Sequence, residues 1–331
     1  MRSLIQFAQD GLRGVAAMAG DGLCYRLAGV RSTLELAQRA MSEGRGLAEL
    51  ATELAGEVVD LATAELLVPI DTPDAAHILV SGTGLTHLGS AEGRDKMHKA
   101  ASQGNGGGDG ENLTDSMRMF VMGLNNGKPA DGAIGVQPEW FYKGDGSILV
   151  AGNAPLIRPH FAGDGGEEPE VAGVYLIGPD GQPHRLGFVL GNEFSDHVTE
   201  RVNYLWLAPS KLRQAALGAE LLLGELPQDL RGTSQIRRDG TVIWQKAFLS
   251  GEANMSHSVA NLEHHHFKYA QFRHAGQVHV HFFGTATLSC ADGIETQAGD
   301  IFEISADGFR LGLTNVMVDG ADAGMMRVKL L

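Results

Sequence analysis

The stretch EPEVAGVYLIG, residues 168 to 178, decides the fold of this chain and its candidate chemistry. Two carboxylates, Glu168 and Glu170, stand two positions apart and lead into an apolar run. Side chains at this spacing point to the same side of a β-strand. The sequence therefore predicts a strand that opens with a pair of carboxylates able to hold a hard cation.

A second apolar segment, LGFVLGNE at residues 186 to 193, ends on a third carboxylate, Glu193, and Lys211 follows 18 positions later. Three carboxylates that leave coordination positions open suit Mg²⁺ or Mn²⁺, because both ions prefer oxygen ligands and Mg²⁺ keeps waters that a substrate can displace. Taken alone, a Glu-x-Glu pair is a weak signal, since charged pairs at this spacing also occur on solvent-exposed strands.

The chain has 331 residues, of which 43% are hydrophobic and 20% are charged. This length and composition are typical of a globular protein that can bury a large core. Cys24 and Cys290 give no disulfide framework, and residues 1 to 30 hold no uninterrupted apolar segment. We therefore expect a cytoplasmic protein without a membrane partner. The formal charge of −14, without a Lys/Arg cluster, argues against nucleic acid. An anionic substrate then needs a metal or local cation.

Turn and periodicity signals divide the chain into a small N-terminal region, residues 1 to 75, and a larger β-rich region, residues 76 to 331. Within the first region, residues 3 to 28 predict a β-meander with tight turns. A helix capped by Ser32 or Thr33 is expected from residue 34 to 41, and residues 44 to 66 continue at helical spacing.

The glycine-dense segment at residues 101 to 112 is the strongest break in the sequence. Such glycine density does not hold a rigid element. The segment is interpreted either as a mobile flap over a pocket or as a surface excursion. It lacks the Gly-Lys-Ser/Thr ending of a phosphate-binding loop.

The histidines favour structural roles over a metal site. Three adjacent imidazoles at residues 264 to 266 cannot all face one ion, which favours a position at a helix end or on the surface. His279 and His281 have the spacing of a zinc pair, yet no third ligand stands out nearby, so cross-strand packing is predicted.

The order of these features resembles the core signature of the fumarylacetoacetate hydrolase superfamily. In that signature a Glu-x-Glu pair opens a strand, an Asn-acid step ends the next strand, and a lysine follows. The likeness spans about residues 78 to 320. Its pieces are residues 81–86 (SGTGLT), 138–144 (PEWFYKG), 168–178, 187–193, Lys211, 283–285 (FGT), 299–304 (GDIFEI) and 313–316 (LTNV).

The resemblance implies an α+β fold that is mostly β, with a mixed β-roll catalytic domain over residues 76 to 331 behind the small N-terminal α+β region. It implies Mg²⁺ or Mn²⁺ bound by Glu168, Glu170 and Glu193. It also implies a homodimer, and it places His87 and His98 beside the active-site lid and His257 near the cleft.

One departure separates this chain from the hydrolases of the superfamily. Those enzymes commonly follow the Gly-Leu turn with a His-x-x-Glu pair that holds and activates the attacking water. This chain has Ser90 where the histidine would fall, and Glu92 is displaced by one position. A serine is not a general base near neutral pH, so the departure weakens the hydrolase interpretation. His87 is a candidate substitute.

Thr86 and Glu139 instead resemble residues of the 2-keto-3-deoxy-D-arabinonate dehydratases in the same superfamily. The 18-position step from Glu193 to Lys211 also matches that branch, although its members usually have Asp where this chain has Glu193. This likeness implies that Lys211 stabilises an enolate or takes the C3 proton. It implies that Glu139 protonates the departing C4 hydroxyl and that Thr86 holds a substrate oxygen. Further predicted substrate contacts are Ser90, Lys143 and Thr285.

A metal that chelates a 2-oxo acid through its carboxylate and keto oxygens makes the C3 protons acidic. Together with this chemistry, the likeness to the dehydratase branch implies a metal-dependent lyase that dehydrates a 2-keto-3-deoxy sugar acid, with 2-keto-3-deoxypentonate giving 2,5-dioxopentanoate. The main alternative is a C–C hydrolase of a 2,4-diketo-3-deoxy sugar acid or acylpyruvate that yields pyruvate, with His87 or Glu92 positioning water. A non-catalytic binding module is the third interpretation, and it leaves three carboxylates and a lysine without a role.

Overall fold

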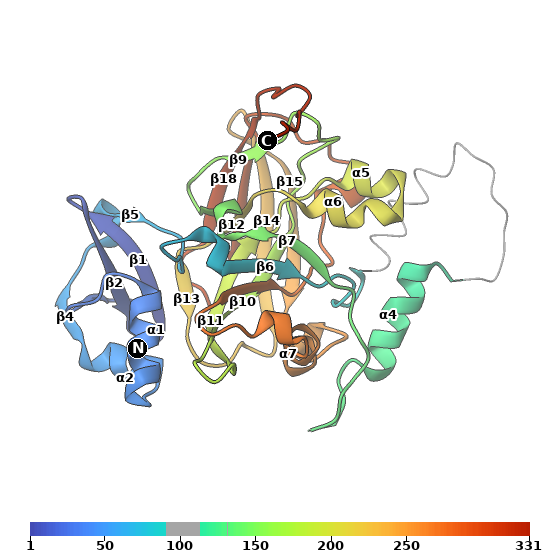
Figure 1. The fold of residues 1–331 in the computed structure, drawn as a ribbon. Helices are drawn as coiled ribbons and strands as arrows, with labels where there is room; N and C mark the ends of the chain where they lie inside the picture. Colours follow the sequence, from blue (N-terminus) through green and yellow to red (C-terminus); the bar gives the residue numbers. More distant parts are fainter. Residues whose placement is uncertain (91–112, 131) are drawn as a thin grey trace, which may run out of the picture.

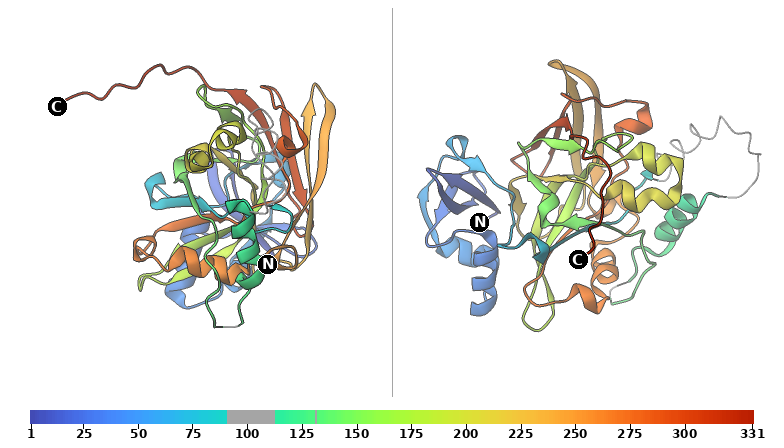
Figure 2. Two further views of the ribbon diagram at one scale, coloured as in Figure 1. Left: turned by 90° about the vertical axis from the view of Figure 1, so that its right-hand side faces the viewer. Right: turned by 45° about the horizontal axis from the view of Figure 1, so that its top comes forward.

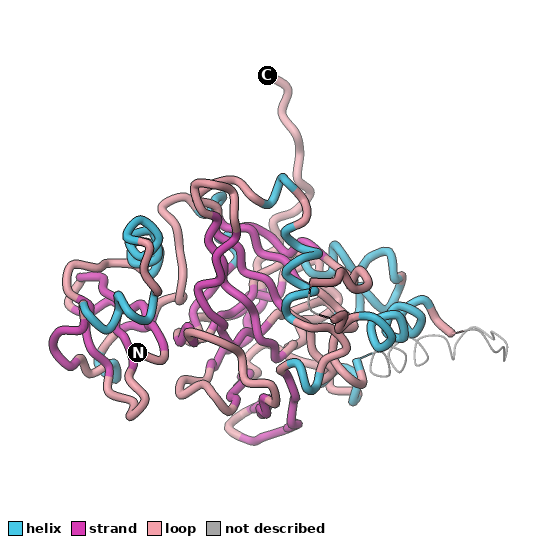
Figure 3. Tube along the Cα trace, turned by 90° about the horizontal axis from the view of Figure 1, so that it is seen from below, coloured by secondary structure: helices cyan, strands magenta, loops and turns pink. Residues whose placement is uncertain are grey.

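The computed structural model describes residues 1–90, 113–130 and 132–331, and it shows the predicted mostly β protein (Figure 1). Among the described residues, thirteen strands form one sheet and five form another. Helices gather on two sides of the strands (Figure 3). The predicted flap at residues 101–112 lies outside the described residues, as do Glu92 and His98. Among the helices of the described part, none is long and apolar enough to cross a membrane.

The N-terminal region begins with the predicted meander. Its three antiparallel strands are β1 (Ser3–Gln9), β2 (Leu12–Met18) and β3 (Cys24–Leu27). The predicted helix follows as α1 (Thr33–Glu43). Ser32 caps it, because its side chain accepts a hydrogen bond from the backbone N–H of Glu35 at 3.1 Å.

The helical spacing of residues 44 to 66 predicts helix correctly only for the first part of that segment. Helix α2 spans Leu47–Glu53, and the chain then extends into β4 (Ala55–Val58), which pairs with β3. A short strand β5 (Glu65–Leu66) pairs with β1. Pairing with strands already in place overrides the modest helical preference of these residues.

The N-terminal strands continue into the main sheet. β1 pairs antiparallel with β13 (Glu220–Leu222), with Ser3 opposite Leu222. The main path of the sheet runs β4-β3-β2-β1-β13-β11-β10-β16-β6-β7. Figure 1 shows the blue N-terminal elements beside β13. One sheet thus joins the two regions that the sequence separates.

The two strands of the central signature lie in the middle of this sheet. β10 (Pro169–Ile177) is buried along its whole length, and β11 (Pro183–Asn192) is its antiparallel neighbour. Their register places Pro169 opposite Asn192. The start of β10 therefore lies beside the end of β11, and the segments that carry the carboxylates meet there.

The five-stranded sheet packs against the main sheet through apolar side chains, including Val171 and Phe188 from one sheet and Ile236 and Phe302 from the other. Its long strands stand beside the main sheet in both views of Figure 2. In spatial order they are β15 (Thr241–Ser250), β14 (Leu230–Arg238), β17 (Ile301–Ala306), β18 (Leu313–Asp319) and β9 (Leu156–Arg158).

The remaining elements complete the main sheet or pack against it. They are β6 (Ile78–Gly82), α4 (Asp115–Asn126), β7 (Phe141–Asp145), β8 (Leu149–Ala151), α5 (His197–Val202), α6 (Leu207–Lys211), β12 (Ala215–Leu217), α7 (Val259–Phe267) and β16 (Val278–Phe282).

Histidines from α7 and β16 pack into a buried stack. His266 Nε2 lies 2.9 Å from His279 Nδ1, and the His266 and His281 ring centroids are 4.5 Å apart. Ser81 Oγ lies 2.8 Å from His281 Nδ1. The predicted cross-strand packing of His279 and His281 is confirmed. The predicted helix-end position of residues 264–266 is confirmed too, whereas a surface role is wrong for His266, which is buried.

Replacing His281 with Gln is expected to flatten the pH dependence of stability in acid. Burial lowers the pKa of His281 to about 3, with a smaller contribution from His279. Below about pH 6.5 the imidazole of His281 binds a proton in the unfolded chain but not in the folded protein. The free energy of unfolding therefore falls by about 1.4 kcal/mol for each pH unit below that value, until about pH 3. The variant should lose a slope of this size.

Urea unfolding followed by circular dichroism at several pH values measures that slope. His274→Gln, at an exposed histidine, is the control for the loss of any imidazole. Equal slopes in wild type and His281→Gln would contradict the expectation.

Candidate metal centre

Three buried carboxylates meet where β10 begins and β11 ends. Glu168 directly precedes β10, Glu170 is its second residue, and Glu193 directly follows β11. One oxygen from each carboxylate lies within 4.8 Å of the others. The residues are 7%, 2% and 0% exposed, respectively. The structure thus brings the three predicted metal ligands together in one buried cluster.

Backbone contacts hold the carboxylates in place. Asn192 Oδ1 accepts hydrogen bonds from the backbone N–H groups of Glu168 and Phe194, each at 3.2 Å, and so ties the two strand ends together. The Gly284 N–H donates to Glu170 Oε2 at 2.7 Å. Gly284 has a φ of +92°, and a Cβ at this position would stand 2.5 Å from a neighbouring hydroxyl oxygen. Only glycine brings its N–H to Glu170 without strain.

Two buried lysines face these carboxylates. Lys211 Nζ donates to Glu168 Oε1 at 2.5 Å, to Glu193 Oε2 at 2.7 Å and to Ser195 Oγ at 2.9 Å. Lys143 Nζ lies 2.5 Å from the other Glu193 oxygen and donates to two backbone carbonyls. Glu193 is therefore held from both sides by ammonium groups.

The carboxylates differ in charge state because their neighbours differ. Burial raises the pKa of Glu170 well above its ordinary value, and the charges of Glu193 and Glu168 raise it further. Burial acts on Glu168 in the same direction, but Lys211 and His197 outweigh it and hold its pKa well below the usual range. Burial lowers the pKa of Lys211, yet Glu168 and Glu193 outweigh it and raise that pKa above the ordinary value.

This donor set fits a hard divalent cation. Lys211 and His197 contact Glu168, and Lys211 and Lys143 contact Glu193. The contact of Glu170 in the described structure is the Gly284 N–H, so Glu170 is the least compensated of the three. A divalent ion would relieve the repulsion that Glu168 and Glu193 exert on Glu170. The donors are all oxygens, which suits Mg²⁺ or Mn²⁺ better than a softer metal. Glu168, Glu170 and Glu193 are the residues that would hold the ion.

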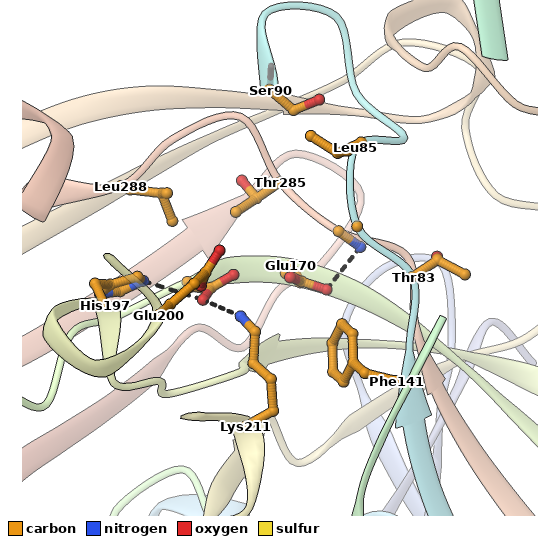
Figure 4. A pocket seen from close by; sticks show the side chains of 13 residues that line it. Thr83, Leu85, Ser90, Phe141, Glu170, His197, Glu200, Lys211, Thr285 and Leu288 are labelled. Carbon is orange, nitrogen blue, oxygen red and sulfur yellow. Dashed lines mark hydrogen bonds and ion pairs between the residues drawn. The ribbon is translucent and has the colours of Figure 1, made fainter. Parts of the chain in front are cut away.

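A pocket opens directly onto the carboxylates (Figure 4). Its walls combine hydroxyl, apolar and charged side chains that lie in or next to β10, β16, β6 and β7, and in α5 and α6. The lining residues are Thr83, Gly84, Leu85, Ser90, Phe141, Glu168, Glu170, His197, Glu200, Lys211, Gly284, Thr285 and Leu288. Five predicted site residues are among them, namely Glu168, Glu170, Lys211, Ser90 and Thr285.

Thr86 and His87 lie beside the pocket but do not line it in the described structure. Thr86 Oγ1 donates to the backbone carbonyl of Phe283. The His87 ring is buried, with Nε2 3.1 Å from Ser250 Oγ, and burial lowers its pKa to about 3. A catalytic role for either residue stays a prediction, and the turned-away ring of His87 gives it no support as a water-activating group.

Glu139 and Lys143 sit behind the pocket wall. Glu139 is 6% exposed, and the Tyr204 hydroxyl donates to its Oε1 at 3.1 Å. Burial lowers the pKa of Lys143 to about 8, against the opposing charge of Glu193. Substrate contact by Lys143 stays a prediction without support from this position, because its ammonium group is occupied by protein atoms. His257 lies outside the pocket too, where its Nδ1 is 3.1 Å from Asn261 Nδ2.

Sequence reasoning missed two charged residues of the pocket, His197 and Glu200. Both lie on the short helix α5, three positions apart and so on one face. His197 Nε2 lies 3.1 Å from Glu168 Oε1. The Asp196-His197 step begins three positions after Glu193, the third carboxylate, and Glu200 follows His197 by three positions; this pattern was a usable signal in the sequence.

No protein-family model and no curated protein matches the chain. Solved structures, in contrast, match nearly the whole chain. A 2-keto-3-deoxy-D-arabinonate dehydratase complexed with magnesium and 2,5-dioxopentanoate aligns with a TM-score of 0.67 at 18% identity, over 96% of this chain and 99% of that one. A 5-carboxymethyl-2-hydroxymuconate delta-isomerase from Mycobacterium smegmatis aligns with a TM-score of 0.59 at 18% identity, over 96% of this chain and all of the other.

A fumarylacetoacetate hydrolase from psychrophilic Exiguobacterium antarcticum aligns with a TM-score of 0.61 at 16% identity, over 97% of this chain and all of the other. The chain therefore has the fold of the fumarylacetoacetate hydrolase structures, as predicted. These neighbours carry different reactions on this fold, so the reaction has to be argued from the site.

Proposed function

We propose that this protein is a metal-dependent lyase that removes water from a 2-keto-3-deoxy sugar acid, converting 2-keto-3-deoxypentonate to 2,5-dioxopentanoate. The observation that carries the proposal is the buried cluster of Glu168, Glu170 and Glu193 with Lys211 at the floor of a pocket. A dehydratase with this fold, complexed with magnesium and 2,5-dioxopentanoate, supports the assignment.

A divalent ion bound by the three carboxylates would polarise the 2-oxo group and increase the acidity of the C3 protons. Lys211 is the ammonium group on the described pocket wall, and Glu168 and Glu193 raise its pKa and keep it charged. Its three hydrogen bonds fix Nζ at the floor of the pocket, so its positive charge is preoriented to stabilise the negative charge that develops when C3 loses a proton.

Glu139 is the proposed acid for the departing C4 hydroxyl. It stands two positions before Phe141, which begins β7 and lines the pocket. The Tyr204 hydroxyl orients the carboxyl group. Loss of water from C3 and C4 and transfer of a C5 proton give the 2,5-dioxo acid. Thr285 and Ser90 present hydroxyl groups that suit the remaining substrate oxygens.

One observation favours the alternative function, hydrolytic C–C cleavage of a 2,4-diketo acid. The Glu200 carboxylate lines the pocket and is chemically able to hold a water molecule. The predicted candidates for that role give less support, since His87 turns toward Ser250 and Glu92 lies outside the described residues.

Product analysis separates the two functions. The Mg²⁺-loaded protein is incubated with each 2-keto-3-deoxypentonate epimer and with 2,4-diketo-3-deoxypentonate, and the products are read by mass spectrometry. We expect the loss of one water to 2,5-dioxopentanoate, abolished by a chelator. Pyruvate and glycolate from the diketo acid, with no dehydration of the other substrates, would overturn the lyase proposal and support the hydrolase.

A further inference from the structure

Glu167 is a buried carboxylate that the proposed chemistry does not use. It is 0% exposed and directly precedes Glu168 in the chain. Ser289 contacts both of its oxygens, because the Ser289 backbone N–H donates to Oε1 at 2.9 Å and the Ser289 hydroxyl lies 2.6 Å from Oε2. Both contacts form in either charge state of Glu167, since a serine hydroxyl can donate or accept a hydrogen bond.

Ser289 directly follows a stretch of chain that forms one wall of the pocket. This wall segment, residues 284–288, lies between β16 and the 3₁₀ helix η7 (Ser289–Asp292), and it belongs to no strand or helix. Thr285 and Leu288 line the pocket, and Figure 4 shows both side chains there. Without strand pairing or helical hydrogen bonds, the wall segment depends on side-chain contacts for its position.

The wall segment is fixed at both ends by carboxylates from the beginning of β10. At its start, the Gly284 N–H donates to Glu170 at 2.7 Å. At its end, Ser289 contacts Glu167. Between these points the Thr287 hydroxyl donates to a backbone carbonyl of β15 at 3.1 Å. The chain region that carries two metal ligands therefore also holds this wall of the pocket.

Glu167 differs from Glu170 in that it has no part in the proposed metal centre. The group of described carboxylates close enough to share one ion consists of Glu168, Glu170 and Glu193. Glu167 does not line the pocket in the described structure either. Any effect of Glu167 on a bound ligand must therefore pass through Ser289 and the wall segment.

We propose that Glu167 is a positioning residue that, through Ser289, holds Thr285 and Leu288 in place before the substrate binds. A ligand that enters a pocket with ordered walls does not have to immobilise their side chains, and this saving appears as affinity. The inference rests on the proposed function, because the pocket beside the carboxylates must be the place where a 2-oxo acid binds.

Variants at Glu167 and one matched control test the proposal. Glu167→Ala removes both contacts with Ser289. Glu167→Gln keeps them, because its amide oxygen accepts from the N–H and its amide nitrogen donates to the hydroxyl. The control is Glu220→Ala, since Glu220 is also buried, also accepts from a serine hydroxyl and backbone N–H groups, and lies outside the pocket.

Three quantities are measured for each folded variant. They are the dissociation constant of pyruvate in saturating Mg²⁺ by calorimetry, the affinity for Mn²⁺, and the hydrogen–deuterium exchange of the peptide that covers residues 284–289. Glu167→Ala should bind pyruvate at least about fivefold more weakly, because binding must then order the wall side chains. Its 284–289 peptide should exchange faster, and its affinity for Mn²⁺ should be retained. Glu167→Gln and Glu220→Ala should keep the wild-type affinity for pyruvate.

Ser289→Ala provides a second test that does not depend on the folding of Glu167→Ala. It removes the hydroxyl contact and keeps the N–H contact, so pyruvate binding should weaken by at least about twofold and the 284–289 peptide should again exchange faster. Unchanged pyruvate affinity or unchanged exchange in this variant would overturn the inference alone.

Two other results would also overturn the inference and leave the proposed function standing. One is an equal loss of pyruvate affinity in Glu220→Ala, which would mark a general effect of lost stability. The other is a parallel loss of Mn²⁺ affinity in Glu167→Ala, which would place the effect at the metal centre. Failure of Mg²⁺-loaded wild type to bind pyruvate would overturn the proposed function, and the inference with it.

Discussion

Replacing Glu170 with Gln is expected to stabilise the metal-free protein and to weaken its affinity for divalent cations strongly. In the metal-free state, burial and the charges of Glu193 and Glu168 disfavour an ionised Glu170. A neutral amide removes that repulsion and still accepts the hydrogen bond from Gly284. Replacing a buried charge by a neutral group can stabilise a protein by about 1–3 kcal/mol. The metal-free variant should therefore unfold at a higher temperature than wild type.

The same change should weaken Mg²⁺ binding by at least about 100-fold, because even partners of metal ligands contribute 10- to 100-fold to affinity. Thermal unfolding with chelator and with Mg²⁺ measures both effects. Wild type gains about 2.7 kcal/mol at a metal concentration of about 100 times its dissociation constant, whereas Glu170→Gln, with binding weakened at least about 100-fold, gains at most about 0.4 kcal/mol.

Glu220→Gln is the matched control for this experiment. Glu220 is a buried glutamate outside the metal centre, and it accepts hydrogen bonds from Ser3 Oγ and from the backbone N–H groups of Arg310 and Leu311. Loss of its charge weakens those bonds, so this variant should be destabilised and keep its response to Mg²⁺. Destabilisation of metal-free Glu170→Gln to the same degree would contradict the interpretation of Glu170 as an uncompensated charge.

Replacing Lys211 with Met is expected to lower kcat by about 10²- to 10³-fold on the dehydration substrate, the range typical of removing a preorganised group that stabilises developing negative charge. Removing an ammonium from beside Glu168 and Glu193 leaves the carboxylate cluster more negative. The affinity for Mg²⁺ should therefore be kept or increased. Steady-state kinetics together with Mn²⁺ titration reads out the two effects independently.

Lys143→Met is the control for losing a buried lysine at the same carboxylate. Lys143 pairs with Glu193 from behind and does not line the pocket, so its loss should act mainly on stability, by about 3–5 kcal/mol. The folded fraction should keep more activity than Lys211→Met. Wild-type kcat in Lys211→Met would remove Lys211 from the proposed chemistry.

The carboxylate pair and its apolar run are the part of the fold that the sequence predicts best. Period-two spacing at Glu168 and Glu170 places both side chains on one side of β10, and the antiparallel hairpin with β11 then brings Glu193 beside them. The N-terminal meander and helix α1 follow from local turn and cap signals. The end of α2 does not, because β4 forms only through pairing with β3, a contact that no local signal encodes.

The same contrast between local signals and tertiary contacts decides which site residues the sequence predicts. The predicted ligands and Lys211 come from strands and a helix whose register is fixed by the core, and the structure brings them together. His197 and Glu200 were not predicted as pocket residues, because their place in the pocket depends on how α5 packs beside the carboxylates. Lys143 was predicted to touch substrate from its place in a motif, whereas its position depends on tertiary packing behind Glu193.

The most direct test of the metal centre is a titration of the chelator-treated protein with Mn²⁺, followed by electron paramagnetic resonance of the free ion. One saturable site per chain is expected, lost in Glu170→Gln, displaced by Mg²⁺ and retained in Glu220→Gln. Addition of a 2-oxo acid should change the spectrum of the bound ion. Absence of saturable binding, or equal binding by wild type and Glu170→Gln, would contradict the assignment of Glu168, Glu170 and Glu193 as the metal centre.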